Sequence, residues 1–112
     1  MKARNLTMVG LLVIMLALVS PVLAQSDRGA ITGRVTDQNG AVVPNAKVTA
    51  ANVETNDERG ATTNDEGHFT IPQLQAASYR LKVEATGFKT ASVEDVQIAV
   101  QITRTVDVTL VG

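Results

Sequence analysis

The sequence predicts an all-β domain, either a sandwich or a small barrel of seven short strands. Residues 78–85 alternate strictly, with Tyr79, Leu81, Val83 and Ala85 on one face and polar or charged residues on the other. This period of two is typical of a half-buried strand. Turn signals recur about every ten residues, which favours a sandwich or barrel over a few long strands. No helical periodicity of useful length follows the N-terminal segment.

The other strands follow from the same alternation. They are expected at residues 30–36, 46–51, 61–63, 68–71 and 91–93, with a final apolar stretch at 96–110. Residues 37–40 and 64–67 combine Asn and Asp with Gly, which favours tight turns. Residues 54–60 are polar and charged, and we expect a mobile loop there. We expect the strand at 68–71 to end at the break that begins with Pro72, because proline cannot donate to a strand ladder.

The final apolar stretch leaves two possibilities open. Its even-numbered residues face one way and are interrupted only at Arg104; they are Val96, Ile98, Val100, Ile102, Val106, Val108 and Leu110. The interruption indicates either a turn between two short strands or a bulge in one long strand. We favour a turn within residues 101–104.

The first 24 residues have the pattern of a secretory signal helix that precedes the folded domain. Lys2 and Arg4 make a positive start, residues 8–19 are apolar and uncharged, and small or slim residues lead to Ala24. The sequence thus predicts a signal peptide at 1–24 and a mature domain at 25–112, beginning at Gln25. The alternative is an uncleaved anchor, although the apolar run is shorter than the roughly 20 residues of a membrane span. No cysteine follows the run, so acylation as a lipoprotein is excluded.

Composition limits the mature domain further. The 112-residue chain has no cysteine and a net charge of −1, and loss of Lys2 and Arg4 would bring this to −3. The core must therefore stand on packing without disulfides. The slightly acidic balance argues against nucleic acid and against electrostatic attachment to anionic lipid.

The mature chain resembles the carboxypeptidase regulatory-like domain, a transthyretin-like (prealbumin-like) Greek-key sandwich of seven strands. The matching residues are Gly33, Val35, Asp37, Gly40, Val43, Pro44, Ala46, Val48, Thr63, Gly67, Phe69, Ile71, Leu74, Tyr79, Leu81, Val83, Gly87 and Phe88. Asn45 stands where the family usually has Gly, which Asn can replace because it tolerates a left-handed backbone. Ala76 and Ala77 stand where it usually has Pro-Gly, and alanine tolerates that backbone poorly. We therefore expect this turn to have another geometry.

The resemblance also implies a setting. A signal peptide followed by this domain is similar to the N-terminus of bacterial TonB-dependent receptor-like outer-membrane proteins, where the domain precedes a plug and a β-barrel. This implies export to the periplasm, association with the outer membrane or an extracellular place. The implied partners are downstream receptor domains or envelope proteins. The chain is read as either a short stand-alone member or a truncated receptor.

We expect no catalytic, cofactor-binding or metal-binding residues. His68 is the single histidine and lacks cysteine or histidine partners for a metal. The turns at 37–40 and 64–67 place oxygens near glycine without the ligand spacing of an EF-hand. Ser26, Ser78 and Ser92 lie outside any nucleophile-elbow motif. In the family that the chain resembles, peptidase chemistry belongs to a separate domain, so the prediction is a non-enzyme.

Three further hypotheses concern carbohydrate binding, an internal covalent cross-link and pairing with a partner protein. A carbohydrate-binding module would need exposed aromatics, but Phe69, Tyr79 and Phe88 fall on inward or turn-packing positions. An internal isopeptide bond could at best join Lys47 to Asp107, and Lys47 is on the wrong strand for it. An edge strand could pair with a strand of a partner protein. We favour a non-catalytic interaction domain, with carbohydrate binding as the alternative and a spacer without ligand as a weaker third reading.

Overall fold

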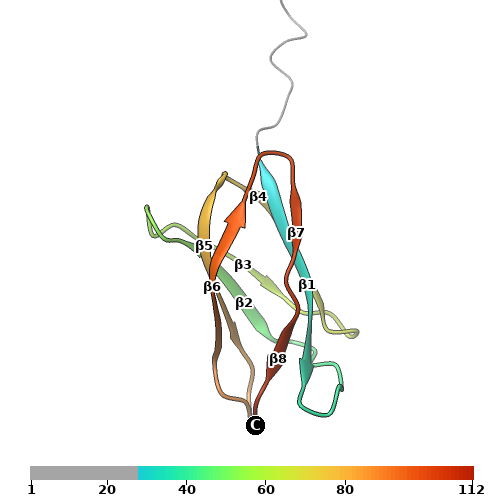
Figure 1. Ribbon diagram of the computed structural model, residues 1–112. Coiled ribbons are helices and arrows are strands. Elements are labelled where there is room, and N and C mark those ends of the chain that lie inside the picture. Colours follow the sequence, from blue (N-terminus) through green and yellow to red (C-terminus); the bar gives the residue numbers. More distant parts are fainter. Residues whose placement is uncertain (1–27) are drawn as a thin grey trace, which may run out of the picture.

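A computed structural model describes residues 28–112, which form two packed β-sheets (Figure 1). The strands of the first half are β1 (Gly29–Asp37), β2 (Lys47–Asn52), β3 (Glu58–Thr62) and β4 (His68–Leu74). Those of the second half are β5 (Ala77–Glu84), β6 (Ala91–Ile98), β7 (Thr103–Thr105) and β8 (Val108–Leu110). The predicted all-β sandwich is confirmed. The predicted signal helix and signal peptide at 1–24 lie outside the described residues.

Strand β1 is the centre of one sheet. It pairs antiparallel with β4 on one side and parallel with β7 and β8 on the other. The second sheet has the order β3-β2-β5-β6 and is antiparallel throughout. Strands β1 and β8 therefore bring the first and last parts of the described chain side by side.

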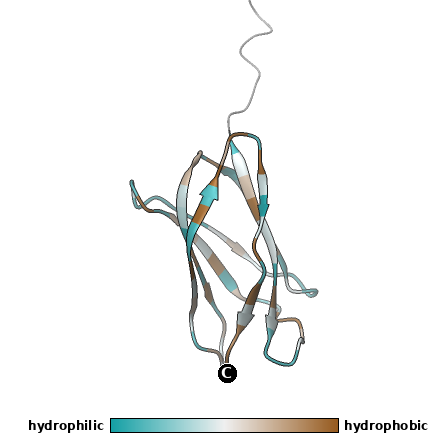
Figure 2. Cartoon of the chain, viewed as in Figure 1, coloured by the Kyte–Doolittle hydropathy of each residue, from teal (hydrophilic) through white to brown (hydrophobic). Residues whose placement is uncertain are grey.

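The core lies between the sheets and is almost wholly apolar. More and less buried residues alternate along strands such as β1 and β5. Figure 2 shows hydrophobic and hydrophilic residues interspersed along the ribbon. The buried apolar residues are Ile31, Val35, Val43, Ala46, Val48, Ala50, Phe69, Ile71, Leu74, Tyr79, Leu81, Val83, Val96, Ile98, Val108 and Leu110. Burial of these side chains is the main favourable term in folding. Phe69 and Tyr79 are buried and Phe88 packs against the core, so the three aromatics contribute to packing as predicted.

Two strand ends differ from the prediction because of bulges. Strand β4 does not end at Pro72 but continues to Leu74, with Pro72 and Gln73 together opposite Ala30. Strand β6 does not end at residues 94–95 but continues to Ile98, with Glu94 and Asp95 opposite one residue of β5. In each bulge one residue adopts a left-handed backbone, with φ of 60° and 57°. An extra residue turns the chain so that side chains three positions apart can face the core.

The loop predicted at 54–60 is also shorter and more ordered than expected. Its last three residues belong to β3, and the connection is only 53–57. The buried Asn52 side chain accepts hydrogen bonds from the Glu54 and Thr55 N–H groups at 2.9 and 3.3 Å. The backbone N–H of Asn52 also donates to the carbonyl of Asp57. These bonds close the loop as a tight turn rather than a mobile segment.

The final apolar stretch folds as two short strands after a turn. The turn comes slightly earlier than the favoured one, between the end of β6 and the start of β7, and the Ile102 N–H donates to the Ala99 carbonyl. The alternation placed Val100 and Ile102 on the same face as Val96 and Ile98, but both are 52% exposed because they belong to this turn. The chain breaks again between β7 and β8, at residues 106–107 and not at Arg104.

The turn before β5 has the different geometry that its Ala-Ala sequence indicated. Neither Ala76 nor Ala77 has a positive φ; Gln73 has it instead. Asn45, in place of the family's usual glycine, has a φ of 60°, in agreement with its tolerance for this region.

Candidate interaction surface

The loops at the end of the sandwich where β1 begins form the candidate surface, which we call the Arg28 end. It consists of Arg28, the β2–β3 loop at 53–57, the β4–β5 connection at 75–76 and the β6–β7 turn at 99–102. Figure 1 shows β1 starting beside the β6–β7 turn, with residue 112 at the opposite end.

A small polar cavity of about 90 Å³ opens at the Arg28 end. It is lined by Arg28, Asn52, Asp57, Arg59, Gln73, Leu74, Gln75 and Tyr79. The lining residues come from four segments of the chain, and the left-handed Gln73 is one of them. Left-handed residues other than glycine cost free energy and persist only where surrounding contacts fix them.

The Tyr79 side chain, which is 3% exposed, brings a hydroxyl group to this cavity. It donates a hydrogen bond of 2.8 Å to the Gln75 carbonyl. Burial raises the pKa of Tyr79 above its usual value of 10.0, and a hydrogen bond from the Asn52 side chain and the charges of Arg28 and Arg59 oppose that rise. Desolvation is the larger effect, so it favours the neutral phenol, which serves here as a hydrogen-bond donor.

Exposed apolar side chains gather in the loops of the same end. Val53 is 46% exposed, and Val100 and Ile102 are each 52% exposed. The fourth large apolar side chain exposed in the described chain is Val111, at the opposite end. Single exposed apolar residues are common on protein surfaces, but three in the loops of one end resemble a contact surface more closely.

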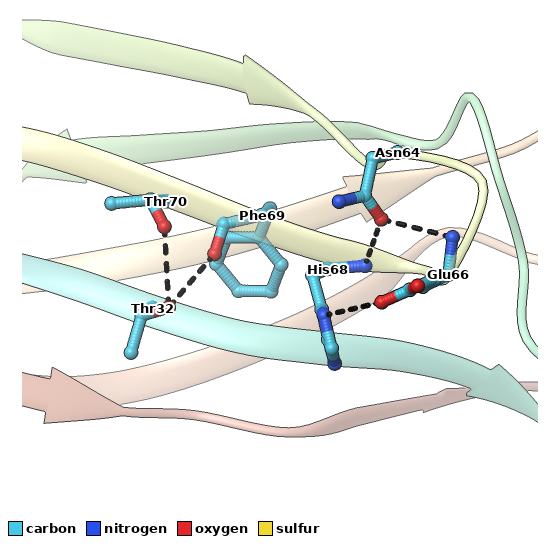
Figure 3. Close-up of polar contacts among 6 residues, drawn as sticks. All are labelled: Thr32, Asn64, Glu66, His68, Phe69 and Thr70. Atoms are coloured by element: carbon cyan, nitrogen blue, oxygen red, sulfur yellow. Dashed lines mark hydrogen bonds and ion pairs between the residues drawn. The ribbon is translucent and has the colours of Figure 1, made fainter.

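His68 is the first residue of β4, the edge strand of the sheet that contains β1, and it lies away from the Arg28 end. Its Nδ1 is 3.6 Å from Glu66 Oε2, and both side chains are more than half exposed (Figure 3). The Asn64 side-chain oxygen accepts the Glu66 and His68 N–H groups, each at 3.0 Å. The residues around His68 thus form a solvated turn.

Each of the two turns considered for a cation uses one side-chain oxygen for its own backbone. Asp37 Oδ1 accepts the Asn39 and Ala41 N–H groups at 2.9 Å each, as Asn64 Oδ1 does in the other turn. Residues 28–112 contain no group of three or more His, Cys, Asp or Glu side chains placed to hold a metal ion.

The remaining residues singled out in the sequence are dispersed. Ser78 Oγ is 3.0 Å from the Gln97 side-chain nitrogen, which donates to it. Ser92 lies on β6, and Ser26 is outside the described residues. Lys47 is on β2 in one sheet, whereas Asp107 lies between β7 and β8 in the other and accepts the Arg34 N–H at 3.0 Å. The isopeptide hypothesis is therefore not supported.

Sequence reasoning missed the Arg28 end because its residues are far apart in the chain. The arginines and glutamines that line the cavity occur singly and match no spacing motif. The one usable signal was that Val100 and Ile102 lie at or beside the turn favoured within residues 101–104, where strand pairing ends.

The chain belongs to the carboxypeptidase regulatory-like domain family, whose profile matches residues 30–111. The match spans all eight strands except the first residue of β1. The family consists of non-catalytic β-sandwich domains, and the resemblance that the sequence suggested is confirmed. No curated protein sequence matches the chain significantly.

Solved structures share the fold at low sequence identity. A protein from Bacteroides uniformis with a proposed role in carbohydrate binding aligns with a TM-score of 0.61 at 18% identity, over 77% of this chain and 42% of its own. Chlorocatechol 1,2-dioxygenase from Pseudomonas putida has a TM-score of 0.61 at 12% identity, over 80% and 63%. A cohesin–X-dockerin complex from Acetivibrio cellulolyticus contains a chain with a TM-score of 0.53 at 18% identity, over 73% and 56%. This chain thus spans between 42% and 63% of these structures, and the likeness concerns the fold alone.

Proposed function

We propose that the protein is a non-catalytic interaction domain of the bacterial envelope that binds another protein through its Arg28 end. The observation that carries the proposal is the exposure of Val53, Val100 and Ile102 in loops of the same end. Arg28 lines a small cavity there with Arg59, and it lines a second hollow with Ile102. Apolar contact with an arginine nearby is the composition that protein interfaces favour. The aromatics that a sugar platform would need are used in the core.

The proposal includes export of the domain from the cytoplasm. A leader at 1–24 would carry the domain out of the cytoplasm, and the family resemblance relates it to the periplasmic front of a TonB-dependent outer-membrane receptor. Among the described residues no helix has the length and apolar character needed to cross a membrane. Expression of the full chain in a Gram-negative host tests this step: we expect a mature protein that starts at Gln25 in the periplasmic fraction. Full-length protein retained in the cytoplasm would contradict export.

Binding is tested with surface variants of the full chain. Immobilised wild-type protein should capture an envelope protein saturably, and the double variant Val100→Asp/Ile102→Asp should lose most of this binding. Val111→Asp is the control for position, because it places an acidic group at an exposed apolar residue of the opposite end. Equal binding by all three proteins would contradict the proposed surface.

Carbohydrate binding is the second candidate. It is favoured by the fold shared with the Bacteroides uniformis protein and by the amide side chains of Asn52, Gln73 and Gln75 around the cavity. Amides can hydrogen-bond sugar hydroxyls. A glycan array probed with the wild-type protein separates the candidates. Saturable sugar binding that is lost on Gln73→Gly, which removes the amide and keeps the left-handed turn, with Val100→Asp/Ile102→Asp unchanged, would favour the carbohydrate and overturn the first proposal.

A further inference from the structure

The first strand of the described chain pairs in parallel with its last two strands. Within one sheet, β1 pairs with β7 from Ala30↔Thr103 to Thr32↔Thr105, and with β8 from Val35↔Val108 to Asp37↔Leu110. All three strands run in the same direction. Residue 28 consequently emerges at one end of the sandwich and residue 112 at the other (Figure 1).

This arrangement determines how the fold resists a force applied between residues 28 and 112. Tension between residues 28 and 112 draws β1 and β8 in opposite directions along their common axis. The hydrogen bonds between them run across that axis, so they are loaded together and not one after another. Strand β1 is also held on its other side by β4, so it cannot leave without breaking a second ladder.

The pairing remains continuous across the break between β7 and β8. At the break the Val106 N–H donates to the Thr32 carbonyl at 2.8 Å, and Asp107 Oδ1 accepts the Arg34 N–H at 3.0 Å. A side-chain carboxylate thus replaces the backbone acceptor that an unbroken strand would supply. Beyond the other end of β7, the Ala30 N–H donates to the Ile102 carbonyl at 3.0 Å.

Gly33 makes this close approach possible. A Cβ at this position would lie 1.8 Å from the Val106 carbonyl oxygen. The absence of a side chain on the central strand therefore allows the broken partner strand to stay against it.

We propose that β1, β7, β8 and the Asp107 carboxylate form a tension clamp, and that the domain has the further function of resisting extension when the chain is pulled at both ends. This function does not depend on the interaction proposed for the Arg28 end. It would suit a domain that connects an anchored segment to a moving one.

Pulling single molecules along two directions tests the clamp. The chain has no cysteine, so paired handles can be placed uniquely. The pair Ser26→Cys/Gly112→Cys loads the clamp end to end, whereas Gln38→Cys/Gly112→Cys pulls β1 and β8 apart from one end, because Asp37 lies opposite Leu110. We expect the first pair to unfold at a clearly higher mean force. Equal forces, or a higher force for the second pair, would overturn the proposal.

A second measurement separates the clamp from general stability. Under constant end-to-end load, Asp107→Ala should shorten the lifetime of the folded state about tenfold, equivalent to about 1.4 kcal/mol. Asp107→Asn keeps an acceptor oxygen and should retain most of the lifetime. Thr63→Val, which weakens the fold at a residue outside β1, β7 and β8, should change the lifetime much less. If Thr63→Val shortens it as much as Asp107→Ala, no localised clamp exists.

Discussion

A single buried hydroxyl fixes the loop between β1 and β2. Thr63 is 2% exposed, and its Oγ1 donates to the Val43 carbonyl at 2.7 Å and accepts the Ala46 N–H at 2.8 Å. The Thr63 backbone also exchanges hydrogen bonds with Asn45 and Ala46. The sequence placed Thr63 at a strand end, but no pattern indicated that the hydroxyl would be buried, since its partners are 17 and 20 residues away.

Replacement of Thr63 by valine keeps the shape and removes the hydroxyl. Two buried backbone groups then lose their partner, so the free energy of unfolding should fall by about 1–3 kcal/mol. Urea unfolding, followed by the fluorescence of the single tyrosine, measures this change. Thr63→Ser retains the hydroxyl and should be the milder change; a valine variant as stable as wild type would contradict the role of this group.

Gly33 and Gly60 are predicted to respond oppositely to alanine. At Gly33 the new Cβ would collide with the Val106 carbonyl, and the free energy of unfolding should drop by about 1–3 kcal/mol. At Gly60 the nearest atom, the Val48 carbonyl oxygen, is 3.5 Å away, and alanine should be neutral or stabilise by up to about 1 kcal/mol. Thermal unfolding of both variants checks the pair; equal losses would show that the close approach at Gly33 does not matter.

Tyr79 should make the stability of the fold depend on pH in the alkaline range. Its pKa is raised above 10.0 by burial, so the folded state favours the neutral phenol. The stabilisation is complete below pH 10 and is lost as the pH rises through the raised pKa. Because Tyr79 is the only tyrosine and there is no tryptophan, phenolate absorbance reports this group alone. Its midpoint should lie above that of the urea-unfolded chain, and Tyr79→Phe should reduce the loss of stability at high pH. Coincident midpoints would contradict the burial.

At the scale of the element, the two bulges explain most of the error in the predicted strand ends. Ile71 and Leu74 both face the core although they are three residues apart, and so do Val93 and Val96. A strict period of two reads such spacing as the end of a strand. Two inward apolar residues separated by three positions, with proline or acidic residues between them, are the pattern that should have indicated a bulge in an edge strand.

The bulge at Gln73 predicts a contrast between two substitutions. Gln73 has a φ of 60°, which glycine adopts readily and a β-branched residue does not. Gln73→Gly should leave the free energy of unfolding within about 1 kcal/mol of wild type, whereas Gln73→Val should lower it by about 1–3 kcal/mol. Chemical denaturation compares the two. A valine variant as stable as the glycine variant would show that the left-handed turn is not required.

The bulges also influence how the edges behave. Strands β4 and β6 are edge strands, and each is interrupted by a bulge that carries proline or acidic residues. The opposite edge of the first sheet is broken between β7 and β8, and β3 is only five residues long. Natural proteins use these features to prevent strands from pairing between molecules. They weaken the hypothesis that a partner adds a strand to an edge and favour contact through loops.

For the whole molecule, local sequence patterns predicted the strands of the two sheets better than the candidate interaction surface at the Arg28 end. Alternation identified the strands because burial on one face repeats every two residues. The Arg28 end could not be predicted in this way, since it assembles Arg28, Arg59 and Tyr79 from distant segments through sheet pairing. The exposure of Val100 and Ile102 likewise depends on where the chain turns towards β7, which alternation alone does not determine.

The most direct test of the proposed interaction is site-specific photo-crosslinking in intact cells. A photoreactive amino acid at Val100 should join the protein to a defined envelope partner, while the same residue at Val111, on the opposite end, should not. Both positions are exposed, so the comparison controls for accessibility. A distinct adduct from position 100 alone is the predicted result. Identical adducts from both positions, or none from position 100, would contradict an interaction through the Arg28 end.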